Sequence, residues 1–132
     1  MLMMWFGLRM IMVAQIKPSI RKQLEARDPW CWHCGEHNDL IIHHRRNRGM
    51  GGTKGKQAEI TNGLQNLIRV CQRYNFEMES NATVAASANG WGHKLPMWGD
   101  LDMPVFDCTR FTWYVLTTDG GKVEVNFQDT AF

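Results

Sequence analysis

The sequence predicts a small α+β domain, and three observations lead to this prediction. The chain has 132 residues, of which 44% are hydrophobic and 21% charged, which suits one modest globular core rather than a disordered chain. Segments 18–27 and 74–88 have the composition and spacing of helices. Runs of β-forming residues occupy 40–44 and 112–127, the second interrupted by a tight-turn sequence.

Residues 1–14 are an apolar, methionine-rich extension. They do not fit a signal peptide, because Arg9 interrupts the apolar run, no basic segment precedes it and no clear small-residue cleavage site follows. The run is also too short and too interrupted to span a bilayer. Met10 and Met12 are alternative starting points for the working protein, so we expect this extension to be non-essential.

The first predicted helix covers residues 18–27. Ser19 is a candidate N-cap, and Ile20 and Leu24 recur at helical spacing. Asp28-Pro29 should end the helix, because the residue before a proline is disfavoured in helical conformation.

A short strand is predicted at 40–44, followed by a long glycine- and lysine-containing loop at 49–62. A loop of this length without structure of its own is usually functional. Segment 66–71 is ambiguous, because its apolar residues fit a helix as well as a strand and periodicity cannot decide so short a run.

The remaining chain predicts one helix, a connection and a hairpin. The helix runs from Tyr74 to about Ala88 and ends at Asn89-Gly90. Residues 90–110 form a connection rich in tryptophan, proline and glycine. Strands at 112–117 and 122–127 then flank Asp-Gly-Gly, a sequence typical of a β-hairpin turn.

Charge is distributed unevenly, although the formal net charge is only +2. Residues 1–99 carry 13 basic and 7 acidic side chains, whereas 100–132 carry 2 and 6. Between residues 40 and 58 the chain has five basic residues and no acid, which favours a polyanion such as nucleic acid. An ordinary solvated loop is the alternative. The five residues are Arg45, Arg46, Arg48, Lys54 and Lys56.

The chain contains four cysteines, at positions 31, 34, 71 and 108. Cys31 and Cys34 form a Cys-x-x-Cys knuckle. Without a convincing secretion signal, a reducing compartment and a metal knuckle are favoured over a disulfide framework.

Two adjacent histidines end the predicted strand at 40–44. Neighbouring side chains on a strand point to opposite faces, so one of His43 and His44 can bind a metal while the other takes a proton. Asn75 and Glu79 are spaced i, i+4 and share one helix face. With His43 they could cage a divalent cation: the oxygens suit Mg²⁺ or Mn²⁺, and imidazole favours transition metals. The alternative role for Asn75 is to satisfy backbone N–H groups at a helix start.

These residues together resemble the HNH endonucleases, and more closely the small HNH proteins of bacteriophages. The resemblance covers about residues 21–81 and rests on four stretches: Cys-Trp-His-Cys-Gly, Leu-Ile-Ile-His-His-Arg-Arg-Asn-Arg-Gly-Met-Gly-Gly, Asn-Leu-Ile-Arg-Val-Cys and the following Asn75. It implies a ββα-metal core at 15–90, in which two antiparallel strands and a helix surround one cation. It makes 67–71 the second strand, and 91–132 the rest of the same domain.

The resemblance also implies roles. His43 takes the place of the first metal ligand and His44 that of the general base. Asn66 matches the middle asparagine, which ties the strands together and helps orient the base. Asn75 stands where the last histidine usually ligates the metal, which makes the chain an H-N-N variant, and Glu79 is a further possible ligand. The five basic residues between 40 and 58 would hold DNA phosphates.

A structural zinc is uncertain, because Tyr74 stands where many relatives have a fourth cysteine. Three alternatives stay open: His33 or His37 completes a three-cysteine site, Cys108 reaches back from the tail, or no zinc binds. The thiols at the family positions are Cys31, Cys34 and Cys71.

The function that we expect is that of a metal-dependent DNA endonuclease or nickase with a histidine base and a single cation. The cation would be Mg²⁺ or Mn²⁺, with Ni²⁺ or Zn²⁺ as alternatives. A phage-encoded protein of this kind would act on DNA in the host cytoplasm, away from membranes, and phage packaging (terminase) machinery is a candidate partner. The competing hypotheses are a non-catalytic DNA-binding module with the same fold and a structural phage protein with a basic loop.

Overall fold

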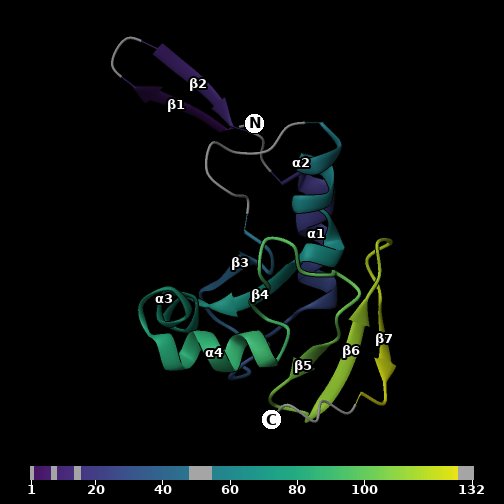
Figure 1. The fold of residues 1–132 in the computed structure, drawn as a ribbon. Coiled ribbons are helices and arrows are strands. Elements are labelled where there is room, and N and C mark those ends of the chain that lie inside the picture. The colour runs from purple at the N-terminus through teal and green to yellow at the C-terminus, as the bar shows by residue number, and fades with distance from the viewer. Residues whose placement is uncertain (1, 7–8, 14–15, 48–54, 128–132) are drawn as a thin grey trace.

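The computed structural model describes residues 2–6, 9–13, 16–47 and 55–127 (Figure 1). Within these ranges helices alternate with three small antiparallel sheets, so the predicted α+β class is confirmed. None of the described helices is long and apolar enough to cross a membrane.

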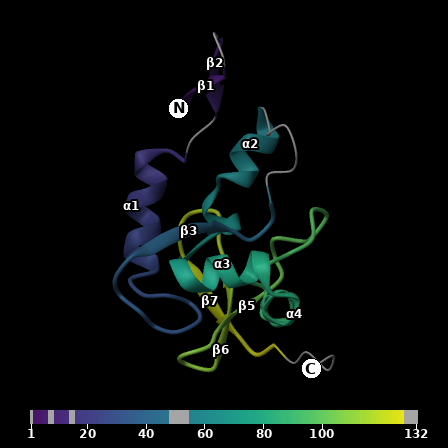
Figure 2. The same ribbon diagram turned by 90° about the vertical axis from the view of Figure 1, so that its left-hand side faces the viewer.

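The first sheet is a hairpin of β1 (Leu2–Phe6) and β2 (Arg9–Val13), which the sequence analysis did not predict. Figures 1 and 2 both show it projecting away from the other elements. Whether it is dispensable stays a prediction.

Helix α1 (Pro18–Arg27) begins at its proline, with Lys17 as the N-cap residue. The expectation that Ser19 caps this helix was therefore wrong: proline is pre-organised for the first helical position, so the helix starts at Pro18 and its cap lies two residues before Ser19. Leu24 is fully buried against Leu64 and Leu67, which attaches the helix to the centre of the molecule.

The central sheet pairs β3 (Leu40–His44) with β4 (Leu67–Cys71) in antiparallel register. The strand expected at 40–44 has the predicted bounds, and the ambiguous segment after it is a strand rather than a helix. Between them, α2 (Lys56–Thr61) and a short 3-10 turn (Leu64–Asn66) lie in and just after the stretch expected to be an unstructured loop.

Two helices follow β4 where one was expected: α3 (Gln72–Ser80) and α4 (Ala82–Gly90). The single-helix prediction was wrong because Asn81 adopts an extended conformation and caps α4. Its side-chain oxygen accepts hydrogen bonds from the backbone N–H groups of Thr83 and Val84, at 2.9 and 3.2 Å. An N-cap asparagine satisfies donors that a helix start leaves unpaired, so it favours a new helix at this point.

The C-terminal sheet has the order β5 (Val105–Asp107), β6 (Thr112–Leu116), β7 (Lys122–Val125). The predicted hairpin is confirmed as β6 and β7, whereas β5 lies in the stretch expected to be only a connection. One buried cluster joins this sheet to β4, α3 and the cysteine knuckle, so residues 91–127 share a core with the centre of the chain. The largest members of the cluster are Trp32, Ile68, Tyr74, Met78 and Leu116.

Candidate functional site

His43 and His44 end β3 and lie on its opposite faces, as the alternation of a strand requires. They pair with Ile68 and Leu67 of β4. His43 is 5% exposed and faces α3, whereas His44 is half-buried. The two imidazoles therefore have different surroundings.

The ring of His43 is held in one tautomer. Its Nε2 lies 2.8 Å from the backbone oxygen of His93, and because a carbonyl only accepts, Nε2 carries the proton. The lone pair is then on Nδ1. Burial lowers the pKa of His43 below its ordinary value, so the ring is neutral at pH 7; hydrogen bonds that the charged ring would donate to His93 and Asn75 oppose this shift without reversing it. A neutral imidazole whose other nitrogen is hydrogen-bonded is the form that binds metals.

Nδ1 of His43 faces Oδ1 of Asn75 on α3, at 3.2 Å. Two lone pairs that face each other repel unless the amide turns to present its NH₂ group or a cation lies between them. Adjacent ligands of an octahedral Mg²⁺ or Mn²⁺ ion lie about 3 Å apart. The pair therefore fits two neighbouring corners of one coordination shell.

Glu79 lies one helical turn beyond Asn75 and is mostly exposed. Its carboxylate is 3.3 Å from Nζ of Lys94, which also donates to the backbone oxygen of Met78. The carboxylate of Glu79 is therefore paired with Lys94 in this structure. The negative charge of Glu79 also favours the protonated form of His43, which opposes the lowering of its pKa by burial.

His44 contacts a residue that the sequence analysis missed. Its Nε2 lies 2.9 Å from Oδ1 of Asn62, the residue that ends α2. A proton on Nε2 donated to this oxygen leaves the lone pair on Nδ1, the arrangement of a base held by a neighbouring group. Asn62 lies 18 residues from His44 inside the expected loop, so nothing in the local pattern pointed to it.

Asn66 is fully buried where β3 and β4 meet. Its side-chain oxygen accepts from the N–H of Arg46, and its NH₂ group donates to the backbone oxygens of Arg46 and Thr61, all within 3.0 Å. The amide thus ties the end of one strand to the start of the other. Its effect on the base stays a prediction.

The expectation that Arg45 holds a DNA phosphate was wrong. Its side chain is fully buried, and its guanidinium donates to four backbone oxygens at 2.6–3.1 Å. These bonds use four of its five N–H donors, and the complete burial of the side chain keeps a phosphate away from the fifth. The four acceptors belong to Gln65, Gly92, Leu101 and Met103.

Two of the other basic residues are described. Arg46 is half-buried and gives one hydrogen bond to the backbone oxygen of Gly99, at 3.0 Å, while Lys56 is exposed at the start of α2. Arg48 and Lys54 lie outside the described residues.

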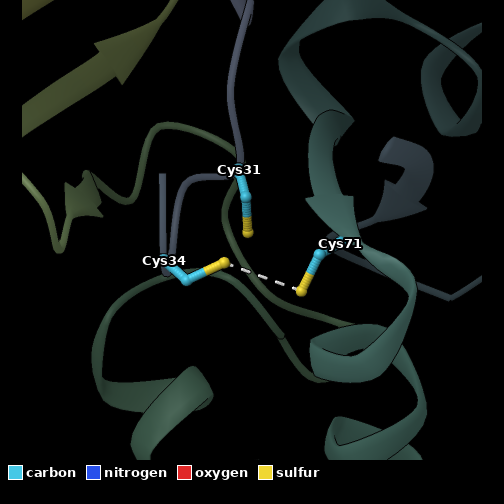
Figure 3. A group of neighbouring side chains, drawn as sticks. All are labelled: Cys31, Cys34 and Cys71. Atoms are coloured by element: carbon cyan, nitrogen blue, oxygen red, sulfur yellow. Dashed lines mark hydrogen bonds between the residues drawn. The ribbon is translucent and has the colours of Figure 1, made fainter. Parts of the chain in front are cut away.

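Figure 3 shows that Cys31 and Cys34 of the knuckle converge on Cys71 at the end of β4. The three sulfurs lie within 4.8 Å of one another, and the Sγ atoms of Cys34 and Cys71 are 3.7 Å apart. Two thiolates bound to one tetrahedral zinc lie about 3.8 Å apart, since each Zn–S bond is about 2.3 Å. Backbone N–H groups of His33 and Tyr74 also point at the sulfurs of Cys31 and Cys71. The cluster can hold a metal ion.

No fourth cysteine, histidine or carboxylate joins this group in the part of the chain that the structure describes. His33 instead stacks on Tyr74 with ring centroids 4.0 Å apart, and His37 lies edge-on to Trp30. Cys108 is outside the group, so neither proposed way of completing the site is present.

Tyr74 of α3 links to two buried groups through hydrogen bonds. Its hydroxyl donates to Nδ1 of the fully buried His93, at 2.6 Å, and Nε2 of His93 donates to the backbone oxygen of Phe106, at 2.7 Å. Burial raises the pKa of Tyr74 and lowers that of His93 to about 3, so both groups are neutral. The backbone oxygen of the same His93 fixes the tautomer of His43.

Comparisons with known protein families, with curated proteins and with solved structures found no significant match to this chain.

The burial of Arg45 leads to a stability prediction. Replacing Arg45 by alanine should lower the free energy of unfolding by about 3 kcal/mol or more, because four buried backbone oxygens lose their donor. Arg46→Ala, which removes one side-chain hydrogen bond, should cost about 1 kcal/mol. Urea unfolding followed by circular dichroism measures both. Equal stability of the two variants would contradict the structural role of Arg45.

Proposed function

We propose that this chain is a metal-dependent DNA endonuclease or nickase that hydrolyses phosphodiester bonds with a histidine base and one divalent cation. The observation that carries the proposal is the facing pair of Nδ1 of His43 and Oδ1 of Asn75, 3.2 Å apart, with His44 next along the strand on its other face. The succession of β3, β4 and α3 is also the order that the resemblance to small phage HNH proteins implies.

The cation would be held by His43 and Asn75, with Glu79 as a further ligand when it leaves Lys94. A neutral amide is a weaker ligand for transition metals than imidazole, so Mg²⁺ and Mn²⁺ are favoured over Ni²⁺ and Zn²⁺. When bound, the ion neutralises charge that builds up on the phosphate and on the leaving oxygen.

The protein's own part in the reaction centres on His44. Its Nδ1 would take a proton from a water molecule as the water oxygen bonds to phosphorus and the bond from phosphorus to the 3′ oxygen breaks. The leaving oxygen is protonated from solvent, so the products carry 5′-phosphate and 3′-hydroxyl ends. The hydrogen bond from Nε2 to Asn62 keeps this tautomer in place.

Arg46 and Lys56 would contact the DNA backbone, together with Arg48 and Lys54. Such contacts give affinity that depends on salt and carries little sequence information. By its resemblance to small phage proteins, the chain would act in the host cytoplasm and serve the phage packaging machinery.

The three clustered thiols would hold a structural zinc with the fourth position left to water. Three observations support this part of the proposal: the sulfur separations, the two backbone N–H groups aimed at the sulfurs, and the junction of knuckle and β4 in the core.

The first prediction concerns the base. With Mg²⁺ or Mn²⁺ the protein should nick supercoiled plasmid, and His44→Ala should lower the rate by about a hundred- to ten-thousandfold, the usual contribution of general-base catalysis. His37→Ala is the matched control, because His37 is an exposed histidine on the knuckle side. It should cut at the wild-type rate.

Gel mobility shifts separate the two functions that the fold could have. An enzyme should still bind DNA after His44→Ala. A wild-type protein that binds DNA but never nicks with Mg²⁺, Mn²⁺ or Ni²⁺ would favour the non-catalytic binding module and refute the nuclease.

A second prediction concerns the zinc. Purified protein should contain about one zinc per chain by elemental analysis, and Cys71→Ser should lose it and unfold at a lower temperature, because metal binding contributes directly to folding stability. Cys108→Ser is the matched control, since Cys108 is outside the cluster, and it should retain the metal. Zinc-free protein with unchanged thermal unfolding in a chelator would contradict this assignment.

A further inference from the structure

The connection between α4 and β5 is built as a rigid turn that displays two apolar side chains. The N–H of Gly99 donates to the backbone oxygen of Pro96, at 2.8 Å, which places Met97 and Trp98 at the tip of a β-turn. Trp98 is 86% exposed and Met97 64% exposed. A side chain on Gly99 would collide with Leu95 and Pro96, since its Cβ would lie 2.8 and 3.0 Å from their atoms, so this closely packed turn requires glycine.

The turn is fixed to the end of the strand that carries the histidines. Leu95 forms a parallel bridge with Arg46, and its N–H donates to the backbone oxygen of Arg45, at 2.6 Å. The side chain of Arg46 bonds to the backbone oxygen of Gly99 on the far side of the turn. The guanidinium of Arg45 donates to backbone oxygens of this connection on both sides of the turn: that of Gly92 before it, and those of Leu101 and Met103 after it. Figure 2 shows this connection, between α4 and β5, on the same side of the molecule as the segment that leaves β3.

We propose that Met97 and Trp98, hereafter the apolar tip, contact the bases of the bound DNA, with the Trp98 ring stacked on a base near the phosphate at the His43–His44 site. This inference rests on the proposed function. Trp98 is three residues from Leu95, and three residues span at most about 11 Å, so the tip lies no farther than this from the bridge between Leu95 and Arg46, which follows His44 by two residues.

Charge near the turn favours a base over a phosphate as the group that meets the ring. The carboxylate of Asp100 accepts the N–H of Asp102, and that of Asp102 accepts from the side chain of Gln65, so both acids stay beside the tip. They repel phosphate, whereas the face of a base carries no charge. The basic side chain of Arg46 braces the turn through its hydrogen bond to the backbone oxygen of Gly99. Apolar side chains that open a base step and aromatic rings that stack on bases are both established ways to hold DNA.

The test measures binding of a short fluorescent DNA duplex in the His44→Ala background, so that the DNA stays intact. Trp98→Ala should weaken binding about tenfold, and Trp98→Phe should restore most of it, because a ring that stacks is enough. The slope of log affinity against log salt should not change, since no phosphate contact is removed. DNA should also quench tryptophan fluorescence less in Trp98→Ala than in the parent.

Phe111→Ala is the matched control: Phe111 is 81% exposed, but it lies at the turn between β5 and β6. It should bind DNA like the parent. If Trp98→Ala binds as well as Phe111→Ala, with the same fluorescence quenching, the tip does not contact DNA and the inference is wrong, even though the nuclease proposal stands. A parent protein that binds no DNA would overturn both.

Discussion

The buried guanidinium of Arg45 is the contact on which the arrangement of the site depends. A charged group inside a protein is costly unless hydrogen bonds satisfy it. Here four backbone oxygens do so, one from the segment before β4 and three from the connection between α4 and β5. One side chain thereby holds together segments that no sheet joins. It fixes the connection that supplies the His93 oxygen to His43, and it supports the turn that carries Trp98.

The two histidines owe their separate roles to groups from other elements. The His93 oxygen sets the tautomer of His43, and the side chain of Asn62 holds Nε2 of His44. Tyr74 extends this arrangement, because its hydroxyl donates to Nδ1 of His93. A hydrogen-bonded link therefore joins α3, the connection after α4 and β5.

The local sequence pattern predicted some secondary-structure elements correctly, but it did not predict the contacts made between distant segments. The strand 40–44 and the hairpin after residue 111 were predictable because their β-forming runs are short and clearly bounded. The break at Asn81 was missed because a helix-compatible composition runs through it, and only the cap contacts decide the matter. The burial of Arg45 was not predictable, since its four acceptors lie 20–58 residues away in sequence and its neighbours are basic. Asn62 was missed for the same reason.

Calorimetric titration of zinc-saturated protein with Mn²⁺ tests whether His43 and Asn75 together form a cation site. Asn75→Ala should weaken Mn²⁺ binding about tenfold or more, because even residues that only support a ligand contribute that much. Asn75→His should tighten it, because imidazole binds Mn²⁺ and Ni²⁺ more strongly than an amide does. Identical Mn²⁺ affinity in the wild type and both variants would show that the facing lone pairs do not bind a cation, and it would contradict the account.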